Sequence, residues 1–316
     1  MKTYIGIDIS KDTFDAATSS QKQSVTLKNS PAGFKKLIKW LGELDTPHIA
    51  MEATGKYYLG LALHLYEQGY PVYVVNPYKI KHHAQSQLKR VKTDSEDAKL
   101  IAEFCEVHTL KPWQPDSPVI SKLQEFSALQ DLLIRTKTCF KNQMQSTLDP
   151  EVQKSQKRQI EQLEEQIEQV QLQMKACVEQ DIDLNKQVEL LTTIKGLGEK
   201  TAIELVTHIK DIDRFDNAKS LASYSGLVPQ IQQSGSSLNR SSLSKMGNVN
   251  LRKCLYMPAI NSMAYNPVLK SFADNLRKRG VAGKKIVAAV MRKLIHLVYA
   301  ILKSGKPFDP EYKIRA

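Results

Sequence analysis

The chain has 316 residues and a net charge of +12, with 41% hydrophobic and 25% charged residues. This length and ordinary globular balance allow two or three domains that each bury a core, which excludes a single small module. Because no apolar run approaches the roughly 18 residues of a membrane-spanning helix, and the first ten residues lack a secretory signal, we expect a cytoplasmic protein.

The first hundred residues alternate between strands and helices. Apolar and β-branched residues predict strands at 2–10, 14–20 and 23–28, and Ser30 followed by Pro31 starts a helix that ends near Glu43. A strand at 48–53, a helix at 57–68, a strand at 71–76 and a helix that begins near residue 92 follow. Three strands and then helix, strand, helix, strand, helix is the element order of the RNase H-like fold, an α/β architecture.

The middle of the chain predicts long helices. Residues 120–148 are expected to be helical, and a second helix after Pro150 carries apolar residues at alternating spacings of three and four. These residues are Ile160, Leu163, Ile167, Val170, Met174 and Cys177. The spacing is typical of a coiled-coil seam. The other positions of this helix are mostly Gln, Glu and Lys, which suit a solvated stalk. We expect a helical hairpin or an oligomerising arm; one long helix on a domain surface is the alternative.

The last third of the chain is helical and basic. Residues 201–316 carry 19 Lys and Arg against 7 Asp and Glu, whereas residues 1–200 carry 26 of each kind. A one-sided excess indicates a polyanion partner, because neutralised phosphates release condensed counterions. A solvated lysine-rich surface has the same composition and stays the alternative.

Two glycines mark a tight turn at 194–202, IKGLGEKTA, which resembles a helix-hairpin-helix motif. Gly196 and Gly198 would let backbone amides at a helix start approach a phosphate, with Lys200 beside them. Turns of this kind also join helices without any ligand.

Asp8 and Glu52 are acids within otherwise apolar strands. A carboxylate there is costly if it is buried without a partner, and a bound metal ion would offset that cost. In an RNase H-like sheet the two strands are adjacent, so one cation could contact both side chains. Without that fold, each acid reads equally well as a surface charge on an edge strand.

Asp94 and Asp97 lie three residues apart at a helix start, on the same face of its first turn. Thr93 and Glu96 fit a capping box, so the alternative is that these acids only complement the helix dipole. Four carboxylates without a His or Cys cluster suit Mg²⁺ or Mn²⁺. Two such ions about 3.5–4 Å apart would stabilise the entering and leaving oxygens of phosphodiester cleavage.

The four cysteines lie far apart with no C-x-x-C pair, which argues against a zinc site or a disulfide framework. We expect all four to be small core residues. They are Cys105, Cys139, Cys177 and Cys254.

Several motifs together resemble the DEDD transposases of bacterial insertion sequences, relatives of the Piv-type DNA invertases. In chain order they are YIGIDISKDTFD, IAMEATGKY, VVNP, KTDSEDAKLIAEFC, IKGLGEKTA, LASYSGLVP, SGSS and LRKCLYMPA. The resemblance covers nearly the whole chain. It implies a RuvC-like catalytic domain at 1–112, a helical coiled-coil segment at 113–187, and a basic helical transposase domain at 188–316.

The resemblance also assigns the site. Asp8, Glu52, Asp94 and Asp97 match the four acidic positions, and Ser234, directly before Gly-Ser-Ser, matches the family's serine nucleophile. Spacing alone does not select Ser234, because six serines crowd one polar loop that is by default only a loop. A serine that attacks a DNA phosphate forms a covalent ester that can be rejoined without an external energy source.

The resemblance implies DNA donors and targets, a noncoding bridge RNA as guide, and a dimer or tetramer in which one active site takes its acids and its serine from different protomers. It places the protein at the bacterial nucleoid, with no membrane partner. Basic residues of the last third are candidate phosphate contacts. They are Arg240, Lys245, Arg252, Lys253, Arg277, Lys278, Arg279, Lys284, Lys285, Arg292 and Lys293. Asn248 stands where many relatives carry histidine and is assigned no role.

Two other classes of protein stay open. One is a Holliday-junction-like nuclease that uses the four acids and water; the other is a non-catalytic nucleic-acid-binding scaffold, which would leave the two strand-borne acids without a partner. A change of Ser234→Ala separates the recombinase from the nuclease, since only the recombinase needs the hydroxyl.

Overall fold

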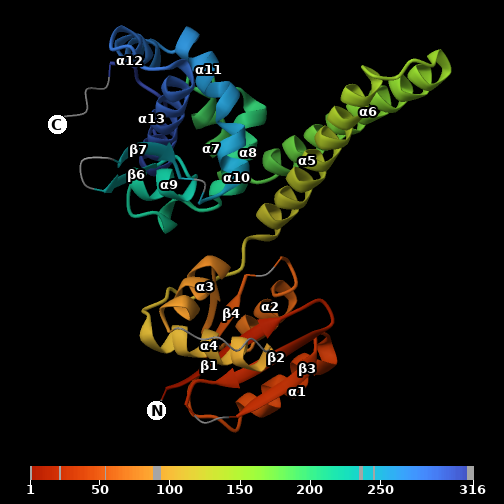
Figure 1. Cartoon of the computed structure of the whole chain (residues 1–316), viewed down its shortest axis with the longest axis vertical. Coiled ribbons are helices and arrows are strands. Elements are labelled where there is room, and N and C mark those ends of the chain that lie inside the picture. The colour runs from red at the N-terminus through yellow and green to blue at the C-terminus, as the bar shows by residue number, and fades with distance from the viewer. Residues whose placement is uncertain are drawn as a thin grey trace. The chain divides into compact units, whose positions relative to one another are not determined.

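The structure is a computed structural model that describes residues 2–20, 23–53, 55–87, 94–234, 238–244 and 246–311, without the side chains of Asp94 and of residues 231–234 and 238–242. The chain forms two compact units, Met1–Pro115 and Asp116–Ala316 (Figure 1). Within the described ranges no helix has the length and apolarity to span a bilayer.

The first unit is built on a five-stranded mixed sheet. Its strands are β1 (Thr3–Ile9), β2 (Thr13–Thr18), β3 (Ser24–Lys28), β4 (Pro47–Glu52) and β5 (Val72–Val75), in the spatial order β3-β2-β1-β4-β5. β1 pairs antiparallel with β2 and parallel with β4, which pairs parallel with β5. The predicted α/β architecture is confirmed, and the predicted order of elements is present with one additional helix after β5.

Helices cover both faces of this sheet. α1 (Pro31–Leu41) and α2 (Leu59–Glu67) contribute to a core that contains Ile5 and Ile7 of β1, whereas α3 (Pro77–Ser86) and α4 (Asp94–Val107) contribute to a second core around Ala50 and Val75. Side chains alternate along a strand, so Tyr4, Gly6 and Asp8 lie on the α4 face. α3 is a helix that the sequence analysis does not predict.

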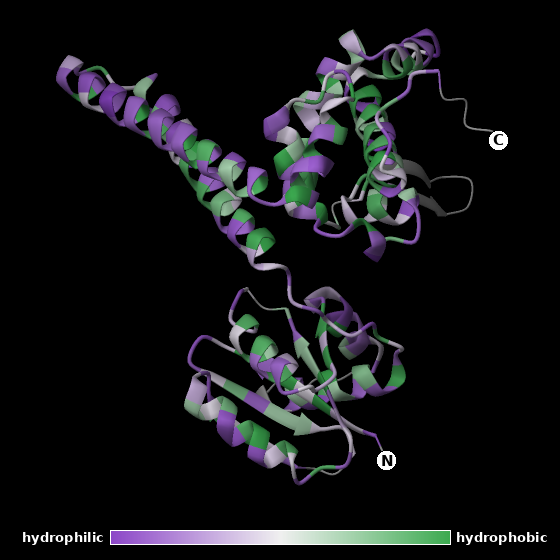
Figure 2. Ribbon diagram, turned by 180° about the vertical axis from the view of Figure 1, so that it is seen from behind, coloured by the Kyte–Doolittle hydropathy of each residue, from purple (hydrophilic) through white to green (hydrophobic). Residues whose placement is uncertain are grey.

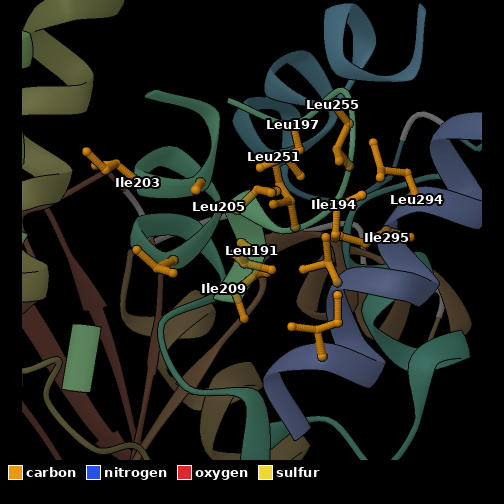
Figure 3. Packing of buried hydrophobic residues seen from close by; sticks show 14 of the residues in the cluster. Leu191, Ile194, Leu197, Ile203, Leu205, Ile209, Leu251, Leu255, Leu294 and Ile295 are labelled. Carbon is orange, nitrogen blue, oxygen red and sulfur yellow. The ribbon is translucent and has the colours of Figure 1, made fainter. Parts of the chain in front are cut away.

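The second unit is mainly helical, as predicted. Its helices are α5 (Pro118–Met144), α6 (Pro150–Glu179), α7 (Ile182–Thr192), α8 (Glu199–Ile209), the 3₁₀ turn η1 (Ile212–Arg214), α9 (Ala218–Tyr224), α10 (Val249–Cys254), α11 (Tyr256–Tyr265), α12 (Pro267–Lys278) and α13 (Gly283–Ser304). Figure 3 shows Leu191, Leu205, Leu251 and Leu294, from α7, α8, α10 and α13, in one packed core.

α5 and α6 form a helical hairpin. The predicted stripe of α6 is buried at Ile160, Ile167, Val170, Met174 and Cys177, because it packs against α5 and the core of the second unit. The hairpin is mostly hydrophilic, in contrast to the hydrophobic α13 (Figure 2). Its supercoiling, and its status as a separate domain at 113–187, stay predictions.

Two expectations are wrong. Cys139 is exposed on α5, whereas Cys105 and Cys177 are buried and Cys254 is half-buried. The serine-rich loop is a two-stranded antiparallel sheet of β6 (Pro229–Ser234) and β7 (Leu238–Leu243). Its strands are rich in Gln, Ser and Asn and carry no apolar alternation, so their pattern resembles that of a loop.

Candidate active site and nucleic-acid interface

β1 and β4 bring two of the predicted acids side by side. The strands run parallel, with Gly6 opposite Ala50 and Ile7 opposite Met51, so Asp8 and Glu52 come next in the same register. Both side chains are half-buried and share the sheet face that α4 covers. The adjacency expected of these two strands is therefore present, and the metal-binding role of the acids stays a prediction.

A glycine lets α4 approach this face closely. A Cβ on Gly6 would lie 1.9 Å from the Ala98 carbonyl oxygen and 2.4 Å from the Ala102 amide nitrogen, so the helix backbone occupies the space of a side chain. Sequence alone does not reveal this contact, because it depends on where the helix packs.

The direction of α4 follows from its two ends. Cys105, near the end of α4, lines a cavity of about 230 Å³ together with Tyr4 and His48, near the starts of β1 and β4. Ala98 lies over Gly6, further along β1. α4 therefore runs opposite to β1, and its first turn, with Asp94 and Asp97, lies toward the strand ends that carry Asp8 and Glu52.

The donor set at this edge of the sheet consists of carboxylates, which are ligands suited to Mg²⁺ and Mn²⁺. Asp97 is half-buried like Asp8 and Glu52, and each of the three already interacts with other groups of the protein. The side chain of Asp94 lies outside the described part. Among the residues that are described, no three His, Cys, Asp or Glu side chains are arranged to hold an ion. The chemistry of the donors fits a divalent cation.

The titratable groups at the opposite end of the sheet have shifted pKa values. His48 Nδ1 and the Tyr73 hydroxyl are 2.9 Å apart, and burial together with nearby Lys2 lowers the pKa of His48. Burial raises the pKa of the Cys105 thiol to about 12. A thiol with that pKa is protonated near neutral pH, so Cys105 is a core residue rather than a nucleophile.

Ser234 is the last residue of β6 and pairs with Leu238, the first residue of β7. The Gly-Ser-Ser segment that follows it, residues 235–237, lies outside the described residues, as does the Ser234 side chain. The serine belongs to the second unit and the four acids to the first.

The two glycines of the predicted helix-hairpin-helix turn differ in role. Gly196 has a φ of +97°, and a Cβ there would lie 2.6 Å from Ser262 Oγ and 2.8 Å from Ser262 Cα, so this glycine permits close packing on α11. Gly198 caps α8, with open space around it, and Lys200 is exposed on the first turn of that helix. Close packing on α11 explains why residue 196 is a glycine, so a phosphate contact is not needed to explain it. The helix-hairpin-helix motif and its phosphate contact stay predictions.

Several predicted phosphate contacts already have partners in the fold. Arg252 Nη1 donates to the Ser225 carbonyl at 3.2 Å, and Lys253 pairs with Asp131 of α5 at 3.1 Å. Lys293 lies over the Phe272 ring, 5.8 Å from its centroid. These side chains hold the second unit together as well as adding charge.

Other basic residues are placed to meet solvent. Lys284 and Lys285 are exposed at the start of α13, and Lys285 and Arg292 line a cavity of about 240 Å³ with Pro229 and Leu243 at the base of the β6–β7 hairpin. Lys278 and Arg279 are exposed at the end of α12, where Arg277 pairs with Asp274 at 2.6 Å. Lys245 and the side chain of Arg240 lie outside the described residues.

α3 carries basic and aromatic side chains that the composition of the whole chain conceals. Residues 77–93 contain five Lys or Arg and no Asp or Glu, although residues 1–200 are balanced in total. The helix begins at Asn76 and Pro77, a capping residue followed by proline. The basic excess and the helix start are both visible in the sequence, and together they could have identified this candidate surface.

Comparisons with known proteins agree with these features. A transposase family model matches residues 5–152, and a model of the transposase IS116/IS110/IS902 family matches residues 188–274. The pilin gene-inverting proteins of Moraxella lacunata and Moraxella bovis are 35% identical over 98% of this chain and 98% of theirs. The transposase of insertion sequence element IS1111A from Coxiella burnetii is 24% identical over 79% of this chain and 75% of its own.

Thermus thermophilus RuvC is similar at 17% identity over 35% of this chain and 99% of that chain, with a TM-score of 0.28, which is too low to carry a conclusion. The assignment to a family rests instead on the two family models and on the relatives that match 98% of the chain. The chain belongs to the IS116/IS110/IS902 family of transposases, enzymes that act on DNA.

Proposed function

We propose that this transposase cuts and rejoins DNA strands with Ser234 as nucleophile and with Asp8, Glu52, Asp94 and Asp97 as ligands of two Mg²⁺ or Mn²⁺ ions. The observation that carries the proposal is the convergence of two strand ends and the first turn of α4 at one edge of the sheet. Carboxylates gathered at one edge are the donor set that hard divalent cations prefer, and bound cations would offset the repulsion between them.

Each group has a defined part in the reaction. Divalent ions, when bound, neutralise charge on the scissile phosphate. A bond forms from Ser234 Oγ to phosphorus while one phosphodiester bond breaks, and the released deoxyribose oxygen takes up the proton that the hydroxyl loses. A deoxyribose hydroxyl of the new strand then attacks the phosphoserine ester and returns the proton to Ser234. The number of ester bonds is unchanged, so no external energy source is needed.

The family resemblance supports two further parts of the proposal. One active site takes its acids from one protomer and Ser234 from another within a dimer or tetramer, and a noncoding bridge RNA selects the DNA. The excess of 19 Lys and Arg over 7 Asp and Glu in residues 201–316 suits both nucleic acids equally.

A comparison of three variants tests the chemistry. Ser234→Ala should abolish both recombination and the covalent protein–DNA adduct, and Asp8→Asn should do the same because the phosphate is no longer activated. Ser236→Ala, a change in the same serine-rich stretch, is the matched control and should retain both. If Ser234→Ala still cuts DNA at the wild-type rate, the protein is a hydrolytic nuclease. If Asp8→Asn still recombines DNA, the metal site has to be abandoned.

Mixing experiments test the assembly. Equal amounts of Asp8→Asn and Ser234→Ala should restore part of the recombination that neither variant performs alone, because mixed oligomers contain one intact composite site. No recovery would contradict a site shared between protomers.

Sequencing of the RNA that co-purifies with the wild-type protein tests the guide. A discrete RNA species is expected. Its absence would refute the proposed guide RNA but not the proposed recombinase chemistry.

A further inference from the structure

A groove lies between α3 and the carboxy-terminal end of α4, on the first unit. We call it the α3–α4 groove. It measures about 500 Å³, within the roughly 300–1,000 Å³ of small-ligand sites, and its lining includes Tyr78, Lys79, His82, His83, Phe104 and His108. We propose that the α3–α4 groove binds unpaired bases of single-stranded DNA that leads away from the cleavage position.

The groove is unusually rich in rings. Tyr78 and His82 lie edge to face with centroids 4.1 Å apart, and Phe104 lies 4.3 Å from His108 and 5.4 Å from His83. Tyr78 is 50% exposed, and His82 and His108 are exposed as well. Exposed ring faces at a groove are a platform on which nucleic-acid bases stack, and stacking tolerates any base because every base has a π-face.

Charge favours a polyanion over a protein partner. None of the described residues that line the groove is acidic, and Lys79 contributes an ammonium group. Lys81 is exposed on the same helix, and the sequence from 77 to 93 carries five Lys or Arg without an Asp or Glu. Unpaired nucleic acid combines a phosphate backbone with bases free to stack, which duplex DNA does not offer.

The position of α3 connects the groove to the acids. Val75, at the end of β5, pairs with Glu52, and α3 begins two residues later at Pro77. Tyr78, on the first turn of α3, is therefore the groove residue nearest that end of the sheet, whereas Phe104 and His108 lie toward the opposite end, where α4 finishes. A strand cut at the acids and followed along α3 would reach Tyr78 first and then His82. The choice of DNA rests on the proposed function, since rings and lysines alone do not distinguish DNA from RNA.

Photocrosslinking locates the bound strand directly. The probe is a single-stranded oligodeoxynucleotide of about 15 nucleotides that carries 5-iododeoxyuridine, irradiated with the full-length protein without divalent cations and mapped by mass spectrometry. Crosslinks are expected within residues 77–87. Tyr78→Ala should reduce them about fivefold or more, the equivalent of about 1 kcal/mol of base stacking, while Tyr78→Phe should retain them.

Tyr66→Ala is the matched control, because Tyr66 is 42% exposed on α2, which packs on the other face of the sheet. Three results would each overturn the proposed binding of single-stranded DNA in the groove. They are crosslinks confined to residues 116–316, a loss of crosslinks in Tyr78→Phe equal to that in Tyr78→Ala, and stronger crosslinking by duplex DNA or RNA. Asp8→Asn should crosslink like the wild type. Normal crosslinking without metal-dependent cleavage would refute the metal chemistry alone, and cleavage without groove crosslinks would refute the groove alone.

Discussion

Gly6 sets the distance between β1 and α4, and a change of Gly6→Ala tests that role. The added Cβ would meet the Ala98 carbonyl oxygen at 1.9 Å and the Ala102 nitrogen at 2.4 Å. Both atoms belong to the helix backbone, so α4 has to move away by about 1.5 Å to restore van der Waals contact. Overpacking of this kind costs about 1–3 kcal/mol. The urea midpoint should therefore fall.

The same displacement moves Asp97 relative to Asp8. Misplacement of a reacting group by about 1 Å lowers rates by about 100-fold, so recombination by Gly6→Ala should fall by that factor even under conditions where the variant is folded. Gly42→Ala is the control, because its Cβ would meet its nearest neighbour at 3.4 Å in a helical conformation. Wild-type unfolding together with wild-type recombination in Gly6→Ala would refute the close packing of α4.

Three further changes test the second unit and the thiols. Gln156→Leu should raise the free energy of unfolding by about 1 kcal/mol, because the Gln156 Oε1 atom is buried in the hairpin without a hydrogen-bond partner; a lower urea midpoint would contradict this. Ser127→Ala should lower the free energy of unfolding by about 1–3 kcal/mol, since the Ser127 hydroxyl donates to Glu204 Oε2 at 2.9 Å in a partly buried contact between α5 and α8; an unchanged urea midpoint would count against that hydrogen bond. A thiol reagent at pH 8 should label exposed Cys139 about tenfold or more faster than Cys105, whose raised pKa of about 12 keeps its thiolate scarce until the pH rises much further; equal labelling rates by mass spectrometry would refute the burial of Cys105.

Periodicity predicts the elements that bury apolar side chains. β1 is evident because Ile5, Ile7 and Ile9 alternate with its other residues, and α6 because its stripe repeats every three and four positions. β6 and β7 escape prediction because their sequences are polar and lack the alternation of apolar residues that indicates a strand. Backbone hydrogen bonds between the two strands pair them nonetheless. α3 escapes because its apolar content is low and its start signal, Asn76 followed by Pro77, is only two residues long.

Local chemistry predicts part of the candidate site. Asp8 and Glu52 stand out because a carboxylate inside an apolar strand is costly unless another group offsets its charge. The register of β1 and β4 places the two residues side by side. The nearness of α4 depends on Gly6, whose importance shows only in three dimensions. Ser234 is selected by family resemblance alone, since nothing in its spacing distinguishes it from neighbouring serines.

Peptide mapping of the covalent intermediate tests the central claim most directly. The wild-type protein is incubated with donor DNA, its RNA and Mg²⁺, digested with nuclease and protease, and examined by mass spectrometry for a nucleotide attached through phosphate. We predict that the modified residue is Ser234 and that Asp8→Asn yields no modified peptide. A nucleotide on any other residue, or strand exchange with no modified peptide at all, would contradict the account.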